Sequence, residues 1–146
     1  MIHLVEVNQD NWQECIKLPT LAEDTQFVAP NVYSIAESKF YPKAKVCCVY
    51  NDEDAMVGFV MYGQDEDDDA LFWVDRLMIA EGQRDKGYGR AVLTAVLAEA
   101  QQRGFKLIGL STKPDNARAI HLYESLGFHA TGEMTGREAI YTRTLP

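Results

Sequence analysis

Apolar runs in the first 42 residues alternate with polar breaks, and their lengths are typical of one strand followed by two short helices. Residues 2–8, IHLVEVN, predict a strand, and the next segment, DNWQECIKL, predicts a helix capped by Asp10 or Asn11. Residues 31–40, NVYSIAESKF, lie between two prolines and predict a short helix with Asn31 as its cap, reached through a flexible approach.

Three β-rich runs follow, with only short polar breaks between them. They are residues 45–51 (KVCCVYN), 55–63 (AMVGFVMYG) and 70–80 (ALFWVDRLMIA). The second break contains five consecutive acidic residues, 65–69, which is typical of a solvated loop between strands. Short breaks of this kind favour an antiparallel meander.

In the second half of the chain, helical and strand-like segments alternate. From residue 93 the apolar positions recur at i, i+3, i+4 and i+7, which predicts an amphipathic helix that begins after Gly87 and ends near Gly104. The order β α α β β β α β α β β predicts one domain, residues 1–146, of the mixed α+β class: a mainly antiparallel sheet of about seven strands flanked by about four helices. Its last elements are expected at 105–112 (strand), 114–127 (helix), and 128–134 and 138–145 (strands).

Composition and net charge limit the classes of function that this chain can have. The chain has 146 residues, 47% hydrophobic and 25% charged, which fits one ordinary soluble domain. A net charge of −8 argues against general nucleic-acid binding and favours a cationic partner. Cys47 and Cys48 are adjacent and should face opposite sides of a strand, so with Cys15 they suit neither a zinc site nor a disulfide framework. We therefore expect no metal, no signal peptide, no membrane span and a cytoplasmic location.

The stretch QRDKGYGRAVL, residues 83–93, places glycines at the start of the expected helix. A helix start carries free N–H groups and a partial positive charge, so it attracts anions such as phosphate. Gly87 and Gly89 would let the backbone approach a phosphate, and Arg84, Lys86 and Arg90 add positive charge. The alternative is an ordinary strand-to-helix connection with a solvated charge cluster.

Two nucleotide-binding patterns fail on this stretch. A P-loop needs Lys and then Ser or Thr after its last glycine, whereas Gly87 is followed by Tyr88 and Gly89. A dinucleotide fingerprint needs a third Gly or Ala where Val92 stands, and a parallel strand–helix–strand unit that the meander does not provide.

RDKGYG (84–89) matches the cofactor signature of the GNAT family of N-acetyltransferases, and NARAIHLYESLGF (116–128) matches a second motif of that family. The chain is therefore identified as similar to this family over nearly its whole length. Within it, FVAPNVYSIAES (27–38) resembles the substrate segment of bacterial spermine/spermidine acetyltransferases, and WVDRLMI (73–79) resembles the strand before their cofactor loop.

The resemblance implies that acetyl-CoA is the cosubstrate and that residues 84–90 hold its pyrophosphate. It further implies that the backbone of Leu77, Met78 and Ile79 pairs with the pantetheine arm. Asn116 would contact that arm, although its position suits a helix cap equally well. The expected cofactor residues are Leu77, Met78, Ile79, Arg84, Asp85, Lys86, Gly87, Tyr88, Gly89, Arg90, Asn116 and Tyr123.

Tyr123 lies in an apolar helical stripe with Ala119, Leu122 and Leu126, where a tyrosine is more often a core residue. The resemblance implies instead that it is the general acid, since a phenol stays protonated at neutral pH and can give its proton to a departing thiolate.

Asp75 interrupts an apolar run, so its carboxylate is either paired with Arg76 or aimed into the active site, where it would take a proton from the amine. Glu37 would bind the distal ammonium group of the acceptor or accept a proton through water; the alternative is an ordinary exposed residue of the helix. Tyr33 and Ser34 are expected in the same pocket.

The function expected from these motifs is acetyl transfer to a small cationic amine, most simply a polyamine such as spermidine or spermine. Two alternatives remain open: another amine acceptor, such as a protein N-terminus, a lysine or an aminoglycoside, and a non-catalytic module that only binds acyl-CoA. The family resemblance also implies a homodimer.

Overall fold

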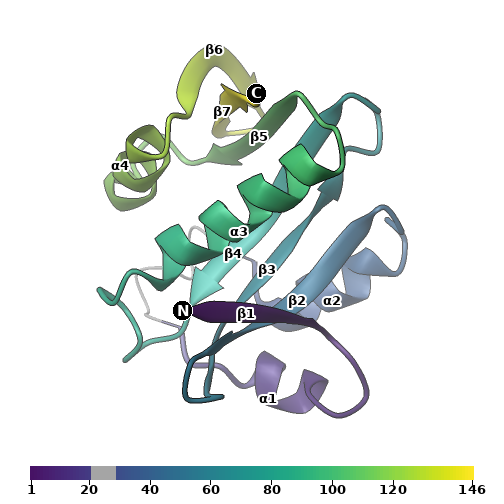
Figure 1. Cartoon of the computed structure of the whole chain (residues 1–146), viewed down its shortest axis with the longest axis vertical. Coiled ribbons are helices and arrows are strands. Elements are labelled where there is room, and N and C mark those ends of the chain that lie inside the picture. Colours follow the sequence, from purple (N-terminus) through teal and green to yellow (C-terminus); the bar gives the residue numbers. More distant parts are fainter. Residues whose placement is uncertain (21–28) are drawn as a thin grey trace.

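The structure, a computed structural model, describes residues 1–20 and 29–146 (Figure 1). The expected flexible approach to the second helix, and Phe27 and Val28 of the substrate-like segment, therefore lie outside the described residues. The elements are β1 (Ile2–Glu6), α1 (Trp12–Ile16), α2 (Asn31–Ser38), β2 (Ala44–Asn51), β3 (Met56–Gln64), β4 (Leu71–Ile79), α3 (Tyr88–Gln102), β5 (Leu107–Thr112), α4 (Ala117–Ser125), β6 (His129–Thr135) and β7 (Glu138–Thr144).

The strands form one seven-stranded sheet in the order β1-β2-β3-β4-β5-β7-β6. Neighbouring strands are antiparallel except β4 and β5, which are parallel because α3 carries the chain back across the sheet between them. The mixed, mainly antiparallel sheet predicted from the element order is confirmed.

The sheet opens between β4 and β5. Their last paired positions are Val74 and Leu110, but β4 continues to Ile79 beside β3 and β5 continues to Thr112 beside β7. The two strands therefore part while each keeps its other neighbour. We call this opening the β4–β5 gap.

A β-bulge lies at the start of the gap. Val74 is opposite Tyr62 on β3 and Arg76 is opposite Met61, so Asp75 is an extra residue between two consecutive pairs. A bulge bends its strand and redirects the side chain at the extra position. Asp75 thus lies on a bent part of β4, next to the last residue that pairs with β5.

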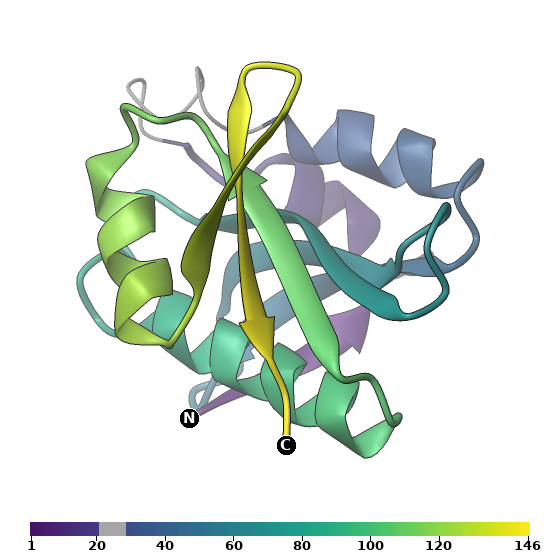
Figure 2. The same cartoon turned by 90° about the horizontal axis from the view of Figure 1, so that it is seen from above.

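Helices cover both faces of the sheet (Figure 1 and Figure 2). One face packs against α3 and α4 and forms the larger core, whereas the other packs against α1 and α2. Cys47 belongs to the first core and Cys48 to the second, which confirms that these neighbours face opposite sides of β2. Both thiols and that of Cys15 are free and buried.

Of two predicted helix caps, Asn31 is wrong, and Asn11 holds the predicted position but makes no capping hydrogen bond. Asn31 is the first residue of α2, after Pro30 at the cap position, and its side-chain amide donates a 3.0 Å hydrogen bond to the carbonyl oxygen of Cys15. Asn11 occupies the cap position of α1, but its side-chain oxygen accepts from the backbone N–H of Asn8 instead of from the helix. In both cases the polar side chain joins segments of the fold and leaves the helix start uncapped.

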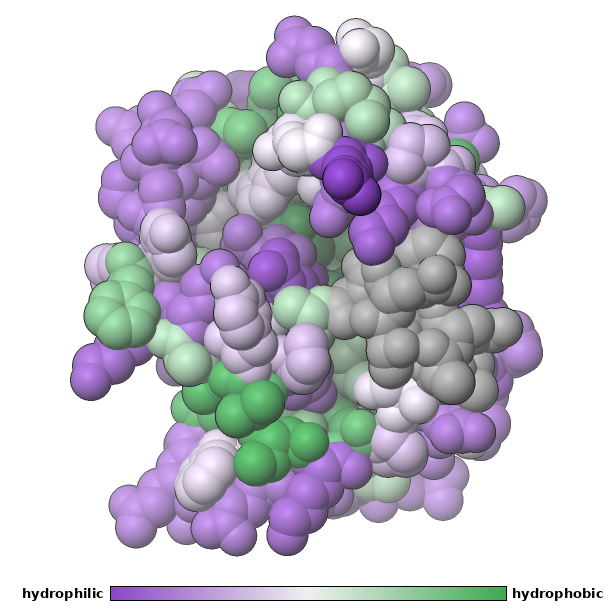
Figure 3. Space-filling view, turned by 180° about the vertical axis from the view of Figure 1, so that it is seen from behind, coloured by the Kyte–Doolittle hydropathy of each residue, from purple (hydrophilic) through white to green (hydrophobic). Residues whose placement is uncertain are grey.

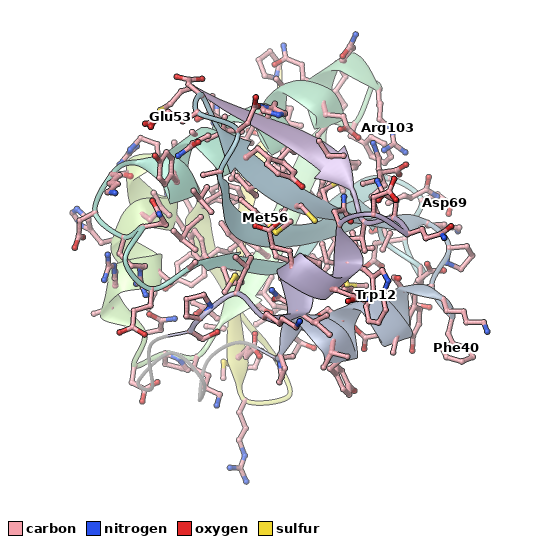
Figure 4. All side chains as sticks on the ribbon, turned by 90° about the horizontal axis from the view of Figure 1, so that it is seen from below. Trp12, Phe40, Glu53, Met56, Asp69 and Arg103 are labelled. Carbon is pink, nitrogen blue, oxygen red and sulfur yellow. The ribbon has the colours of Figure 1, made fainter. Side chains whose placement is uncertain are left out.

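The rear surface is mostly hydrophilic, with a group of apolar side chains in its lower part (Figure 3). Exposed large apolar residues occur on α1, on α2 and just after α2, and Figure 4 shows two of them, Trp12 and Phe40, on one side of the molecule. No helix in the described ranges is long and apolar enough to cross a membrane.

Candidate functional site

A cleft of about 970 Å³ follows the β4–β5 gap. It is lined by the loop before α3, the first residues of α3 and residues of α4. Thr20, Ala29 and Pro30, which precede α2, also line it. Because α2 packs on the face of the sheet opposite α3 and α4, residues from elements on both faces border the cleft.

The α3 end of the cleft has the features of an anion site. Gly87 caps the helix with φ +80°, a left-handed conformation that glycine adopts without strain, as predicted for this turn. A Cβ built on Gly87 would have only the Met1 side chain within 4 Å, at 3.6 Å, so the space over the turn is open. A Cβ on Gly89 would reach Leu122 of α4 at 3.5 Å.

This loop is fixed to α4 by polar contacts. Asp85 has φ +63°, an uncommon conformation for a residue other than glycine, and its carboxylate accepts a 2.7 Å hydrogen bond from Arg118. Arg90 donates a 2.7 Å hydrogen bond to the Ser125 hydroxyl, which also lies on α4. Of the residues expected to bind cofactor, Asp85 and Arg90 thus also join two walls of the cleft.

Further predicted cofactor residues line the same cleft. Leu77, Met78 and Ile79 belong to the part of β4 that has left β5, so their peptide groups border the gap. Their side chains meanwhile serve packing: Leu77 contacts the larger core and Met78 is buried in the smaller one. A role for the backbone and a packing role for the side chains are therefore compatible.

Asn116 caps α4. Its side-chain oxygen accepts a 3.3 Å hydrogen bond from the backbone N–H of Ala119, and the residue also lines the cleft. The helix-cap interpretation is confirmed, and contact with the cofactor stays a prediction.

Tyr123 projects from α4 toward both the core and the cleft. Its ring lies 6.1 Å from that of Phe128 and 6.4 Å from that of Tyr141, and the residue lines the cleft beside Ser111 and Glu138. Burial, with a smaller contribution from the negative charge of Glu138, raises the pKa of Tyr123 to about 12. The phenol is therefore protonated at neutral pH, as a general acid requires.

Asp75 is the ionisable group at the bulge. Burial raises its pKa to about 6; the positive charge of Arg76 opposes this, and the negative charge of Glu37 adds to it. Arg76 donates to the backbone carbonyl of Asp75 at 2.8 Å, and its other terminal nitrogen lies 3.5 Å from the carboxylate of Glu37. Asp75 lines the cleft, as one of its two alternatives requires, and its part in proton transfer stays a prediction.

A second cavity of about 170 Å³ shares Asp75 and Arg76 with the large cleft. Its lining includes the acidic residues Glu37, Asp65 and Glu66 and the aromatic residues Tyr41 and Trp73. The acidic run at 65–69 does form the β3–β4 loop, but its first two residues also line this cavity, which the sequence analysis missed.

Two predicted substrate residues lie elsewhere. Tyr33 is 57% exposed on α2, and Ser34 is completely buried with its hydroxyl oxygen unpaired. Neither lines either cavity in the part of the chain that is described.

The structure instead adds Ser111 and Glu138, which are joined by a 2.8 Å hydrogen bond, to the large cleft. No motif marked this pair, and the only signal in the sequence is a polar residue at an alternating position of each strand. Within the described ranges, no cluster of His, Cys, Asp and Glu has the form of a metal site.

Comparison with known proteins gives the class of protein that this fold and cleft define. The chain belongs to the acetyltransferase (GNAT) family, whose family model matches residues 7–128. It is 30% identical over 139 residues, 91% of each chain, to the spermine/spermidine N(1)-acetyltransferase of Bacillus subtilis. It is also 42% identical to the [ribosomal protein bS18]-alanine N-acetyltransferase of Escherichia coli, but over only 59 residues, 40% of this chain and 38% of that one.

Among solved structures, the spermidine N-acetyltransferase of Vibrio cholerae in complex with CoA and spermine is similar with a TM-score of 0.75 and 16% identity. The match covers 99% of this chain and 94% of the other. This match shows a shared fold and so confirms the predicted fold. The predicted family is confirmed by the family model and the Bacillus subtilis relative.

Proposed function

We propose that this protein transfers the acetyl group of acetyl-CoA to a primary amine of a polyamine such as spermidine or spermine, by direct attack in a ternary complex. The observation that carries the proposal is the position of Asp75, which lines both the large cleft and the smaller acidic cavity. The name of the Bacillus subtilis relative, a spermine/spermidine acetyltransferase, supports the same acceptor.

The cleft fits coenzyme A. The N–H groups and the positive end of α3 lie at residues 84–90, where a pyrophosphate would bind. Beyond this turn, the edge of β4 that has separated from β5 at Leu77, Met78 and Ile79 offers peptide groups to the amides of the pantetheine arm, as an added strand would use them. The Vibrio cholerae neighbour, solved with CoA, supports this cosubstrate.

Two side chains account for the proton transfers that start and end the reaction. A polyamine arrives protonated, because alkylammonium groups have pKa values near about 10. The Asp75 carboxylate, with its pKa raised to about 6, is a stronger base than an ordinary aspartate and takes a proton from the ammonium group, directly or through water. Tyr123 then gives its proton to the sulfur as the thiolate leaves.

The smaller cavity accounts for the preference for a polycation. Glu37, Asp65, Glu66 and Asp75 supply carboxylates there, and Arg76 is the one cationic residue among those described in its lining. An amine that reacts at Asp75 would place its distal ammonium groups against these carboxylates. Trp73 and Tyr41 can add cation–π attraction.

A protein N-terminus is the second candidate acceptor. The 42% identity to an enzyme named for the N-terminal alanine of a ribosomal protein favours it, although that match covers 40% of this chain. A module that binds acyl-CoA without catalysis would show affinity but no transfer.

Mass spectrometry of products separates these functions. The protein is incubated with acetyl-CoA and, in parallel, spermidine, spermine, a mono-amine of similar length, an aminoglycoside, and peptides with free N-termini or lysines. Faster acetylation of the polyamines supports the proposal, and exclusive acetylation of a peptide overturns the acceptor. Tight coenzyme A binding without transfer to any amine identifies a binding module.

A further inference from the structure

We propose that Ser111 and Glu138 form a proton relay on the β5–β7 side of the cleft, through which the attacking nitrogen loses its second proton. The inference rests on the proposed acetyl transfer to an amine and adds residues that neither the sequence motifs nor the comparisons assign.

The strand register places this pair at the reacting end of the gap. Ser111 is the first residue of β5 after Leu110, whose partner Val74 immediately precedes Asp75 on β4. Asp75 and Ser111 are therefore the first residues on the two strands after their last pair. One carboxylate and one hydroxyl thus border the opening from opposite sides.

Alternation along β5 and β7 fixes which face these side chains take. Leu110 and Tyr141 are opposite each other and both are buried in the core under α3 and α4. Ser111, the next residue, faces the other side together with its partner Ile140, and Glu138 lies two residues before Ile140 on that same side. This is the face on which Ala29 and Pro30 line the cleft, opposite the helix start that would bind the cosubstrate.

The hydrogen bond between the two residues has the direction that a relay needs. The Ser111 hydroxyl donates to Oε1 of Glu138 at 2.8 Å, which leaves the lone pairs of the hydroxyl oxygen to accept another proton. A nitrogen that donates to Ser111 can therefore pass a proton on to Glu138 without movement of either side chain.

The reaction itself requires a second proton acceptor. An ammonium group, R–NH₃⁺, becomes an amide, R–NH–CO–CH₃, so its nitrogen loses two protons. Asp75 takes the first and makes the amine a nucleophile. As the C–N bond forms and the C–S electron pair leaves to sulfur, Tyr123 protonates the thiolate, and the nitrogen gives its second proton to Ser111 while Ser111 passes its own to Glu138.

The same carboxylate can restore the acid. Glu138 lies near enough to Tyr123 for its charge to contribute to the raised pKa of the phenol. After Tyr123 has given up its proton, protonated Glu138, which lines the same cleft, returns a proton to it directly or through water, and the proton on Asp75 leaves to solvent. The balance is one amide, one thiol and one released proton for each ammonium and thioester consumed.

Steady-state kinetics of Ser111→Ala, Glu138→Gln and the double variant test the relay. We expect each single variant to lower kcat by roughly tenfold to a hundredfold, at the low end of general acid–base effects. The KM for the amine and the affinity for coenzyme A should stay within about threefold, and the double variant should be no slower than the slower single one, because both act as one unit. Ser111→Thr keeps a hydroxyl and should retain most of the rate.

The matched control is Glu133→Gln, the same change on the exposed surface of β6 in the same hairpin; it should behave like the unmodified enzyme. An unchanged kcat in both single variants, multiplied losses in the double variant, or a loss in KM alone would overturn the relay. If the enzyme ignores polyamines but acetylates another amine, the polyamine proposal fails and the relay is tested with that amine. Absence of transfer to every amine overturns both.

Discussion

Arg118 on α4 donates a 2.7 Å hydrogen bond to Asp85, which lies in the loop before α3. The pair is largely exposed, with 50% and 85% of the two side chains accessible, so it adds less than about 1 kcal/mol to the free energy of unfolding. Its larger effect is on the loop that would hold the pyrophosphate, because it fixes a residue with φ +63°.

Arg118→Gln should therefore weaken coenzyme A binding by about threefold to tenfold with little change in melting temperature. Isothermal calorimetry at low and high salt measures this, and the difference should shrink as salt rises. Arg137→Gln, the same charge change in the turn between β6 and β7, is the control. Equal losses in both variants would mean that only net charge matters.

Gly87→Val should weaken coenzyme A binding at least about tenfold, because a branched side chain fills the space over the turn and strains a left-handed residue. Gly104→Val makes the same change at φ +88° just after α3, with nothing within 4 Å of the added Cβ. Both variants should lose comparable stability in thermal unfolding, and only the first should lose affinity by calorimetry. Unchanged affinity in Gly87→Val would exclude the turn as the pyrophosphate site.

Tyr123→Phe keeps the ring that packs near Phe128 and Tyr141 and removes only the hydroxyl. We expect kcat to fall by about 10² to 10⁴-fold, the range of general acids, with coenzyme A affinity nearly unchanged. Single-turnover measurements separate the chemical step from product release. A rate within about twofold of the unmodified enzyme would leave Tyr123 as a packing residue and require another acid.

The ionisation of Asp75 should be visible in the pH dependence of kcat/KM. Because burial raises its pKa to about 6, kcat/KM should increase as pH rises through about 6, where the carboxylate becomes ionised and able to accept a proton. Asp75→Asn should lower kcat and remove this ionisation from the profile. If kcat/KM of the Asp75→Asn variant still rises with pH in the same range, another group is responsible for that ionisation.

Although Asp75→Asn should lower kcat, it should not lower the stability of the folded protein. A carboxyl whose pKa is higher in the folded than in the unfolded state binds more protons when folded, so its contribution to stability falls as pH rises from about 4 to about 6. At neutral pH, Asp75→Asn removes this unfavourable ionisation and should give a melting temperature at or above that of the unmodified protein.

Glu37→Gln tests recognition of the distal charge. Its carboxylate lies 3.5 Å from Arg76 and lines the smaller cavity, so the change removes one negative charge and leaves the shape. The KM for spermidine should rise about fivefold to fiftyfold, as expected for loss of a charge-assisted contact, whereas the KM for a mono-amine should stay unchanged. Glu14→Gln on exposed α1 is the control. An equal rise in KM for spermidine and for the mono-amine would mean that Glu37 does not bind the distal ammonium group.

The sequence predicted the fold well because its signals are local. Apolar periodicity marked α3, alternation placed Cys47 and Cys48 on opposite faces, and Gly87 marked the start of α3. The turn expected to hold the pyrophosphate could be found from the sequence for the same reason, since residues 84–90 are contiguous.

The acceptor end could not be predicted in the same way. The register between β5 and β7 brings Ser111 and Glu138 together across 27 positions, and the bulge that redirects Asp75 depends on the pairing of β4 with β3. Asn31 illustrates the same limit, because a side chain that suits a helix cap finds a carbonyl 16 residues away.

The β4–β5 gap also divides the strands of the sheet into two groups. The two parts, β1 to β4 and β5 to β7, are joined in the sheet by only four paired positions, Leu71 to Val74 with Leu107 to Leu110. Beyond this short seam each strand pairs only with its other neighbour, and a molecule lying along the gap would add hydrogen bonds there. Amide hydrogen exchange at residues 75–79 should therefore slow when coenzyme A binds, and the melting temperature should rise with its concentration as the two halves become one continuous sheet.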